Sequence, residues 1–253
     1  MEDIKLQKYV SDCGLMSRRA AEKEIAEGNF EVNGMTAAIG MRIDPKNDAV
    51  TYKGRPLNAQ SGRKVYIMFN KPCGAVTTMS DEKGRKTVAD LVNVGTRVYP
   101  VGRLDLNSEG LLLMTNDGEL ANAVMHPSGN IKKVYSVTLR GKVENQTLDR
   151  MRALRELDGE EIAGAEVELV SRNETQSVVK FTLSEGKNRE IRRICEAVGE
   201  YVLKLKRISL GPLQLGDLKT GEYRELNAHE LRALKSAVAK KGANKNGCKN
   251  GCK

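Results

Sequence analysis

The sequence predicts a mixed α+β protein built from two domains and a short tail. Its 253 residues are enough for one sizeable core and a second, smaller domain. A polar stretch with the composition of a linker, AQSGRK, occupies 59–64. Before it, apolar residues recur mainly at helical spacing, whereas after it short β-branched segments alternate with helical patterns. We therefore expect domains over 1–60 and 61–238, followed by a basic disordered tail over 239–253.

The first domain is expected to contain two helices and a few strands. The first helix ends at Gly14, and the second runs from a Ser17 cap to Gly28. Asn33 and Gly34 tolerate the positive φ of a two-residue turn and so predict a β-hairpin. A later strand is expected over 50–52.

In the second domain, the pattern predicts strands and helices in a mixed order. The expected strands are short, rich in β-branched or apolar residues and mostly bounded by turn residues. They cover 65–69, 75–78, 110–115, 133–139, 167–170, 177–183 and 201–208. The expected helices cover 119–125, 146–155, 189–198 and 228–238. This order is typical of an α+β domain with a mixed sheet.

The formal net charge of +9 points to a polyanionic partner. The excess is concentrated in residues 235–253, which contain six Lys and no acidic residue. Residues 1–58, by contrast, carry equal numbers of acidic and basic side chains. A cationic tail fits a nucleic acid partner, but it also fits a tail that only improves solubility. Charge alone leaves both interpretations open.

Composition argues against several classes of protein. No run approaches the roughly 18 apolar residues of a transmembrane helix, and no apolar segment follows Met1, so we expect a soluble, unexported chain without a membrane partner. The five Cys form no framework of close pairs, which favours reduced thiols in the cytoplasm. With only His126 and His229, and no Gly-rich phosphate loop, we expect neither a metal site nor a nucleotide cofactor. Any chemistry then rests on carboxylates and cations.

Two side chains stand out as functional candidates. The segment VGRLDLNSEGLLLMTNDG (101–118) places the carboxylate of Asp105 near Arg103, just before a strongly apolar strand. Asp105 either caps a turn or pairs with Arg103, or it is a functional carboxylate. Tyr135 lies on an alternating strand, where it is either a core residue or a platform on which an extruded base can stack.

A cationic helix face is predicted over 189–198. Apolar residues recur there with helical spacing, while Arg189, Arg192 and Arg193 fall on the opposite arc. Such a face is either simply solvated or in contact with an anion. Cys195 lies in the apolar stripe and is expected to be a small core residue rather than a reactive thiol.

These motifs resemble those of the ribosomal RNA pseudouridine synthases of the Rsu/Rlu type. The strings NKP (70–72), GRLD with the following NSEGLLLMTNDG, the K-x-Y-x-V pattern around Tyr135, and EGKNREIRRIC (185–195) occur in the family's order. The resemblance implies that Asp105 is the catalytic carboxylate, that Tyr135 stacks on the target base, and that Ile191 forms a wall of the base pocket. It implies that Arg192 is the ionic partner of Asp105, because a guanidinium keeps a partly buried carboxylate ionised. The RNA contacts expected in this domain are Arg103, Lys71, Lys187, Arg189 and Arg193.

The string LQKYVSDCGLMSRRAAEKEIAEGNFEVNG resembles the alpha-L RNA-binding module. The resemblance implies phosphate contacts from Ser17, Arg18, Arg19 and Lys23, near a helix start where backbone N–H groups also face an anion. Asn29 stands where that module commonly has a basic residue.

The resemblance implies an enzyme that isomerises uridine to pseudouridine in bacterial ribosomal RNA without a cofactor. The strings DGELANAVMHPS and RISLGPLQLGDLKTGEYREL look most like those of the RluB type, which acts on large-subunit RNA. We expect a cytoplasmic monomer whose partner is ribosomal RNA or a ribosomal subunit precursor. The alternatives are the same chemistry on small-subunit RNA, or a non-catalytic RNA-binding factor in ribosome assembly.

Overall fold

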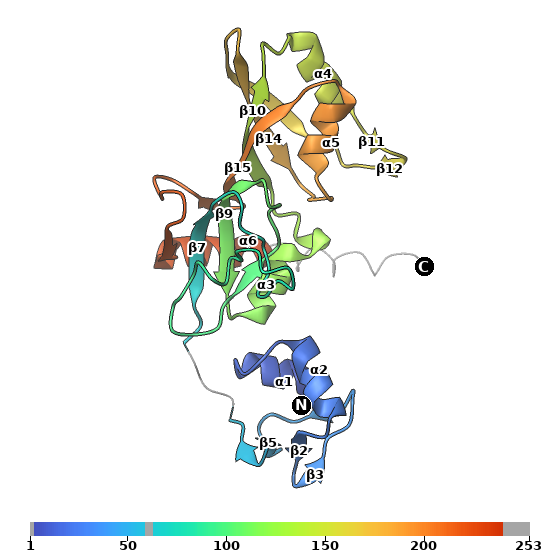
Figure 1. Ribbon diagram of the computed structural model, residues 1–253, viewed down its shortest axis with the longest axis vertical. Helices are drawn as coiled ribbons and strands as arrows, with labels where there is room; N and C mark the ends of the chain where they lie inside the picture. Colours follow the sequence, from blue (N-terminus) through green and yellow to red (C-terminus); the bar gives the residue numbers. More distant parts are fainter. Residues whose placement is uncertain (1–2, 59–62, 240–253) are drawn as a thin grey trace, which may run out of the picture. The chain divides into compact units, whose positions relative to one another are not determined.

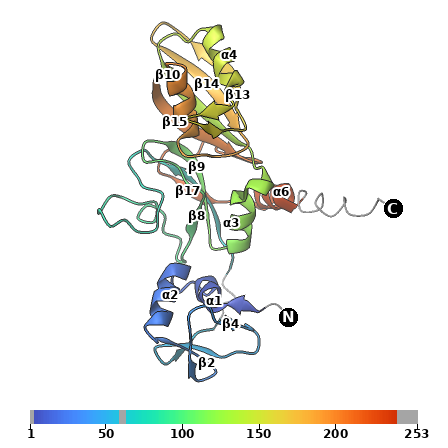
Figure 2. The same ribbon diagram turned by 90° about the vertical axis from the view of Figure 1, so that its right-hand side faces the viewer.

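The computed structural model describes residues 3–58 and 63–239, so the expected disordered tail lies almost entirely outside the described residues. The chain divides into two compact units (Figures 1 and 2). The first comprises the described residues up to Val65, together with Val94–Arg97 and Asn116–Gly118, and the second contains the rest. Each unit has its own architecture and is described separately.

The first unit combines two helices with two small antiparallel sheets. Its elements are β1 (Ile4–Lys5), α1 (Leu6–Asp12), α2 (Arg18–Ala26), β2 (Phe30–Val32), β3 (Met35–Thr36), β4 (Arg42–Ile43), β5 (Val50–Tyr52) and β6 (Arg55–Pro56). Strand β1 pairs with β4, and the other sheet has the order β3-β2-β5-β6. Leu6 and Val10 of α1 share one buried core with Ile25 of α2 and Phe30 of β2.

Local sequence signals explain the helix start and the hairpin of this unit. The Ser17 side chain caps α2 and accepts a hydrogen bond from Ala20 N at 3.2 Å. Asn33 and Gly34 have φ values of 53° and 78° and form the turn between β2 and β3. The expected cap and hairpin are both confirmed.

The second unit is built on a mixed sheet, as predicted. Its strands are β7 (Tyr66–Lys71), β8 (Tyr99–Val101), β9 (Glu109–Thr115), β10 (Lys133–Arg140), β13 (Glu166–Arg172), β14 (Gln176–Leu183), β15 (Val202–Leu210), β16 (Leu213–Gln214) and β17 (Tyr223–Glu225). The order is β13-β14-β10-β15-β9-β7-β17, with β8 paired to β9 and β16 paired to β15. Strands β15 and β9 are parallel, whereas the other neighbours are antiparallel.

Helices cover the two halves of this sheet. They are α3 (Gly118–Met125), the 3₁₀ turn η1 (Pro127–Gly129), α4 (Asn145–Ala153), α5 (Glu190–Ala197) and α6 (Ala228–Ala239). Helices α4 and α5 lie beside the half formed by β13, β14, β10 and β15 (Figures 1 and 2). Near β7 and β9, Met68 and Leu113 share a core with Leu120 and Val124 of α3 and Leu234 of α6. A small separate hairpin, β11 (Glu156–Leu157) and β12 (Glu160–Glu161), precedes β13.

The strand expected over 75–78 is wrong. Of that segment, only Val76 makes a bridge, to Thr87. Other groups there bond to the loop before β9: Gly74 N donates to Leu106 O at 2.8 Å, and Thr77 Oγ1 donates to Leu104 O at 2.6 Å. The β-branched residues of this segment therefore support a loop instead of extending the sheet.

Strands β9 and β15 approach each other unusually closely. Gly110 pairs with Arg207 and has a φ of +106°. A Cβ atom at this position would lie 2.2 Å from Arg207 O, which is far inside van der Waals contact. Because both the angle and the space exclude a side chain, only glycine fits here.

We expect Gly110→Ala to lower the free energy of unfolding strongly in denaturant titrations. The matched control is Gly141→Ala, where φ is +74° and no atom lies within 4 Å of the added carbon. The control carries only backbone strain of roughly 1–2 kcal/mol, whereas Gly110→Ala adds an overpacking penalty of about 1–3 kcal/mol. Equal losses in the two variants would contradict the close-contact explanation.

Candidate active site

A cavity of about 560 Å³ opens in the second unit, between the segments that follow β8 and β14 and the strands β10 and β15. Asp105, Tyr135 and Ile191 all line it, although they come from three distant parts of the chain. The structure thus brings together three of the residues that the sequence motifs single out. Three of the expected RNA-contacting cations also line the cavity: Arg103, Lys187 and Arg189.

Asp105 lies half-buried in the loop between β8 and β9. Its backbone carbonyl accepts hydrogen bonds from Ser108 N at 3.0 Å and from Lys71 Nζ at 3.1 Å. The preceding Leu104 carbonyl is bonded to the Thr77 hydroxyl. The backbone of this loop is therefore held from both sides, and the side chain of Asp105 is presented at the cavity wall.

Lys71 is not placed to contact RNA, which corrects the sequence-based expectation. The side chain is fully buried, and its ammonium donates to three backbone carbonyls: Pro72 O at 3.0 Å, Asp105 O at 3.1 Å and Ser108 O at 2.9 Å. Burial lowers the pKa of Lys71 to about 8, despite the opposing effect of nearby groups that include Cys73 and Asp105. Lys71 thus holds the Asp105 loop in place.

Tyr135 is both a core residue and part of the cavity wall. It is 8% exposed, and its neighbours across the sheet are Phe181 on β14 and Arg207 on β15. Ile191, on the first turn of α5, is also buried and lines the same cavity. The two interpretations of Tyr135 left open by its sequence pattern are therefore compatible.

Arg192 contacts the Asp105 loop through its backbone. Nη2 donates to Asn107 O at 2.8 Å, two residues beyond Asp105, and Nε is buried without a hydrogen-bond partner. Among the described residues, no ion pair within 4.0 Å links Arg192 to Asp105. The expected partner is thus held next to the Asp105 loop, and its contact in this structure is to a carbonyl instead of the carboxylate.

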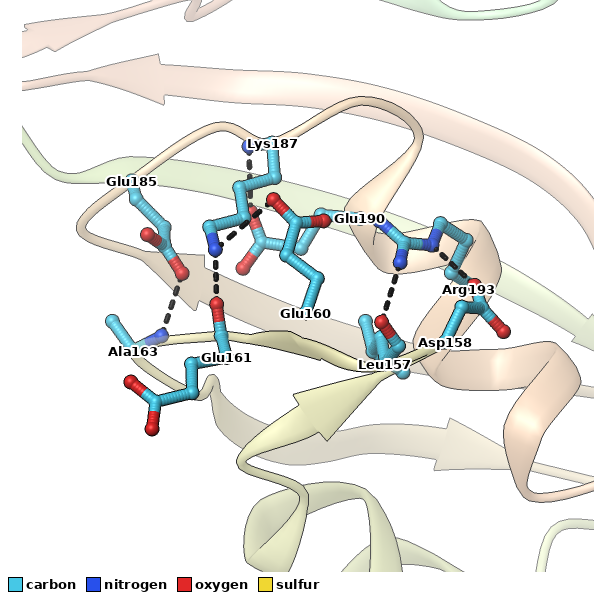
Figure 3. Close-up of polar contacts among 9 residues, drawn as sticks. All are labelled: Leu157, Asp158, Glu160, Glu161, Ala163, Glu185, Lys187, Glu190 and Arg193. Atoms are coloured by element: carbon cyan, nitrogen blue, oxygen red, sulfur yellow. Dashed lines mark hydrogen bonds and ion pairs between the residues drawn. The ribbon is translucent and has the colours of Figure 1, made fainter.

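Lys187 and Arg193 bind the acidic hairpin β11–β12 (Figure 3). Lys187 Nζ lies 3.1 Å from a Glu160 carboxylate oxygen and also donates to Glu161 O. Arg193 pairs with Asp158 at 2.9 Å and with Glu160 at 3.0 Å. Hydrogen bonds from Arg193, and then from Lys187, hold the pKa of Glu160 below its usual value.

This network revises the role expected for those two cations. Their charges are met by protein carboxylates, so neither Lys187 nor Arg193 is a free RNA contact in this structure. Arg189, by contrast, is exposed, in the left-handed conformation that precedes α5. Arg103 is exposed at the cavity as well.

Four charged residues at the cavity were missed as site candidates: Lys133, Glu185, Glu190 and Arg207. Glu190 is buried; burial raises its pKa, and Oε2 accepts a hydrogen bond from Lys187 N at 3.0 Å. Burial, and then the charge of Arg207, lower the pKa of Lys133. Arg207 is 2% exposed and donates from Nε to Leu111 O at 2.7 Å. An arginine in the inward-facing phase of β15 is the sequence signal that could have found it.

Cys195 lies in the buried stripe of α5, as expected. Burial raises the pKa of its thiol to about 12, so the reactive thiolate is scarce at neutral pH.

The cations expected to bind RNA in the first unit lie on α2. Arg18, Arg19 and Lys23 are exposed, and Lys23 lies 3.9 Å from Glu27 along the helix. The Ser17 oxygen is occupied as the helix cap. Three cations thus remain at the surface, while the hydroxyl has a structural role.

Within 3–58 and 63–239, no group of three or more His, Cys, Asp or Glu side chains is arranged to hold a metal ion. In the same residues, no helix is both long enough and apolar enough to span a bilayer.

The buried ammonium of Lys71 predicts a pH dependence of stability. Its folded-state pKa of about 8 lies below the ordinary 10.5, so between these values the unfolded chain binds more protons. This group therefore adds stability as the pH rises through that window, by up to about 3 kcal/mol. Denaturant titrations of wild type and Lys71→Met should diverge in favour of wild type from about pH 8 to 10.5. A constant difference over that range would contradict the assignment.

Comparison with known proteins agrees with the fold. Residues 65–197 match the model of the family described as RNA pseudouridylate synthase. The chain is 41% identical over 244 residues to an uncharacterized RNA pseudouridine synthase of Aquifex aeolicus, covering 95% of this chain and 97% of the relative. It is 38% identical over 244 residues to ribosomal large subunit pseudouridine synthase B of Bacillus subtilis, covering 95% and 98%.

A solved structure gives the same result. The crystal structure of a pseudouridylate synthase superposes with a TM-score of 0.65 at 27% identity, covering 91% of this chain and 99% of that one. Given the matched segment, the extent of these similarities and the mixed sheet, this chain belongs to the RNA pseudouridine synthase family, whose members are isomerases.

Proposed function

We propose that this enzyme converts uridines of large-subunit ribosomal RNA to pseudouridine, with Asp105 as the catalytic carboxylate. The observation that carries the proposal is the placement of Asp105 and Tyr135 on one cavity of about 560 Å³, a size suited to a small-molecule-sized group such as one nucleotide. The choice of the large subunit is supported by the name of the Bacillus subtilis relative.

The reaction conserves every atom of the substrate. The bond from uracil N1 to the ribose breaks, the base rotates, and a bond from C5 to the same ribose carbon forms; C5 then loses a proton and N1 gains one. Because nothing is oxidised or reduced, no redox cofactor enters the proposal. Asp105 acts either as a nucleophile or as a base that removes a proton, and both roles need the ionised carboxylate.

The target base must leave its stack to reach Asp105, which costs a few kcal/mol. In the proposal, the ring of Tyr135 offsets this cost by stacking on the uracil, and Ile191 supports the opposite side of the base. The exposed Arg103 lies at the cavity, where it contacts the RNA backbone or fills the space left in the RNA.

Arg192 is proposed to keep Asp105 ionised when RNA is bound. Its anchor on Asn107 O keeps the guanidinium beside the loop that carries the carboxylate, and its Nε has no partner in the described part of the chain. In the proposal, the Asp105 carboxylate pairs with that group when RNA is bound. The first unit is proposed to be an alpha-L module that adds RNA contacts through Arg18, Arg19 and Lys23, which are exposed on α2.

The substrate is tested by mapping pseudouridines in ribosomal RNA from cells with and without the gene, and then by incubating purified enzyme with each RNA. Loss of a modified position in large-subunit RNA, restored by the enzyme in vitro, is the expected result. Loss of a position only in small-subunit RNA would replace the proposed substrate.

Asp105→Asn should keep RNA binding but abolish isomerisation. Asparagine is nearly isosteric, yet it cannot become an anion or a strong nucleophile. We expect turnover to fall at least about a thousandfold, with the RNA dissociation constant nearly unchanged in a filter-binding assay. Turnover close to that of wild type would exclude the catalytic role.

Tyr135 provides a graded test of stacking. Tyr135→Ala removes the ring and should weaken RNA binding by roughly 1–3 kcal/mol, whereas Tyr135→Phe keeps the ring and should bind like wild type. Any loss of turnover in Tyr135→Phe would then report a separate role of the hydroxyl. Equal RNA affinity in Tyr135→Ala and wild type would contradict stacking.

A further inference from the structure

Arg207 is a buried cation that lines the cavity and makes few hydrogen bonds within the protein. Its side chain donates from Nε to Leu111 O at 2.7 Å. Within the described residues, Nη1 and Nη2 have no hydrogen-bond partner, and no carboxylate lies within salt-bridge distance of the guanidinium. The residue is 2% exposed and Nη2 is itself buried, so solvent does not replace the missing contact of that atom.

A guanidinium in this state is costly. Arginine does not lose its proton in proteins, so burial cannot be relieved by neutralisation as it can for lysine. A buried charge without an acceptor costs more than a buried charge that is paired, and such groups call for a specific explanation.

The surrounding charges do not compensate Arg207. Lys133, a cation whose pKa is lowered by burial and then by the charge of Arg207, is also at the cavity and bonds to Glu185 O at 3.3 Å. Glu185 accepts from Ala163 N at 2.6 Å, and Glu190 accepts from Lys187 N at 3.0 Å through Oε2 (Figure 3). The other Glu190 oxygen, Oε1, is buried without a hydrogen-bond partner among the described residues, and it does not pair with Arg207. The guanidinium of Arg207 therefore remains able to donate to a group that enters the cavity.

Arg207 lies next to Tyr135, the residue proposed to stack on the target uracil. In the antiparallel pairing of β10 and β15, Arg207 lies directly opposite Tyr135, so the two side chains project from the same face of the sheet. The bond from Nε to Leu111 O ties the guanidinium to β9 and leaves the two terminal nitrogens as donors. The close approach of Gly110 to Arg207 fixes the backbone at this point.

From this geometry we propose that Arg207 is a substrate-binding residue, whose terminal nitrogens donate to an acceptor oxygen of the target uridine nucleotide. The oxygen belongs either to a uracil carbonyl or to the phosphate attached to that nucleotide. The inference rests on the proposed function, because that proposal puts the uracil on Tyr135.

The first arm of the test compares enzyme variants of the full chain. Arg207→Met keeps an unbranched apolar stem but removes the guanidinium N–H donors. Because those donors are proposed to bind the substrate, the variant should lower kcat/KM at least about tenfold, mainly through KM. Arg207→Lys keeps a cation and should recover part of the loss. The matched control is Lys206→Met, which removes a half-buried cation from the opposite face of the same strand and should stay within about twofold of wild type.

The second arm changes the substrate, which is a short RNA that contains the target uridine. One RNA carries a neutral methylphosphonate at the phosphate of the target, and two others carry 2-thiouridine or 4-thiouridine, because sulfur is a weak acceptor. Wild type should lose activity on the RNA whose oxygen Arg207 binds, and Arg207→Met should lose nothing further on that RNA. This coupling identifies the oxygen and separates binding from a merely structural role.

Each outcome decides the inference. Coupling between Arg207 and one of the three oxygens supports it. It is overturned if Arg207→Met keeps kcat/KM within about twofold of wild type, or if every altered RNA loses as much with the variant as with wild type. Should Arg207→Met not fold, Arg207→Lys is compared on the same RNAs, where its weaker donor geometry should reduce the coupling. Wild type that makes no pseudouridine would instead refute the proposed function.

Discussion

One buried ammonium, that of Lys71, holds the loop that carries Asp105 at the cavity. Lys71 ends β7, and two of its three hydrogen bonds connect that strand to the backbone of Asp105 and Ser108 in the loop before β9. A neutral side chain at this position would leave three carbonyls without that donor, which is a larger penalty than the loss of one bond. Because the buried ammonium of Lys71 is charged, it requires the three carbonyl oxygens to lie around it. The position of Asp105 relative to the sheet follows from this convergence.

The sheet positions the other residues of the cavity relative to the loop that carries Asp105. Strands β14, β10 and β15 run side by side through antiparallel pairing and carry Phe181, Tyr135 and Arg207 in one row. The parallel contact of β15 with β9 then links this row to the strand that follows the Asp105 loop. The flat ring and the carboxylate are thus positioned by one hydrogen-bonded network, although they lie on a strand and on a loop.

Periodicity and capping were sufficient to predict most of the elements. The longer strands and all four helices of the second unit occur where alternation and helical spacing place them, within a few residues at their ends. In the second unit, strands of two or three residues, such as β8 and β16, were missed because so few residues give no measurable period. The segment around Val76 has strand-like composition but bonds to a loop, since composition does not specify the partner.

The site could be predicted where a motif specifies a residue. It was less predictable where the role of a residue depends on its burial or on strand pairing. Asp105, Tyr135 and Ile191 meet at one cavity as the motifs imply. Lys71 looked like a phosphate contact because its sequence neighbours do not reveal that it is fully buried. Arg207 escaped notice because the strand also carries the exposed Lys204 and the half-buried Lys206, which obscure the alternation that places Arg207 in the inward-facing phase.

The acidic hairpin β11–β12 has a consequence for how the enzyme meets its polyanionic partner. Association with RNA is driven in large part by release of the counterions that cations displace from phosphates, and each such contact adds roughly 0.7–0.9 to the slope of log affinity against log salt. Lys187 and Arg193 already neutralise Glu160 and Asp158, so they contribute little to that release. Under the proposed function, we therefore expect the second unit to bind RNA with a shallower ionic-strength dependence than its number of arginines and lysines suggests. Discrimination at the cavity would then depend more on shape and on directed hydrogen bonds than on bulk charge.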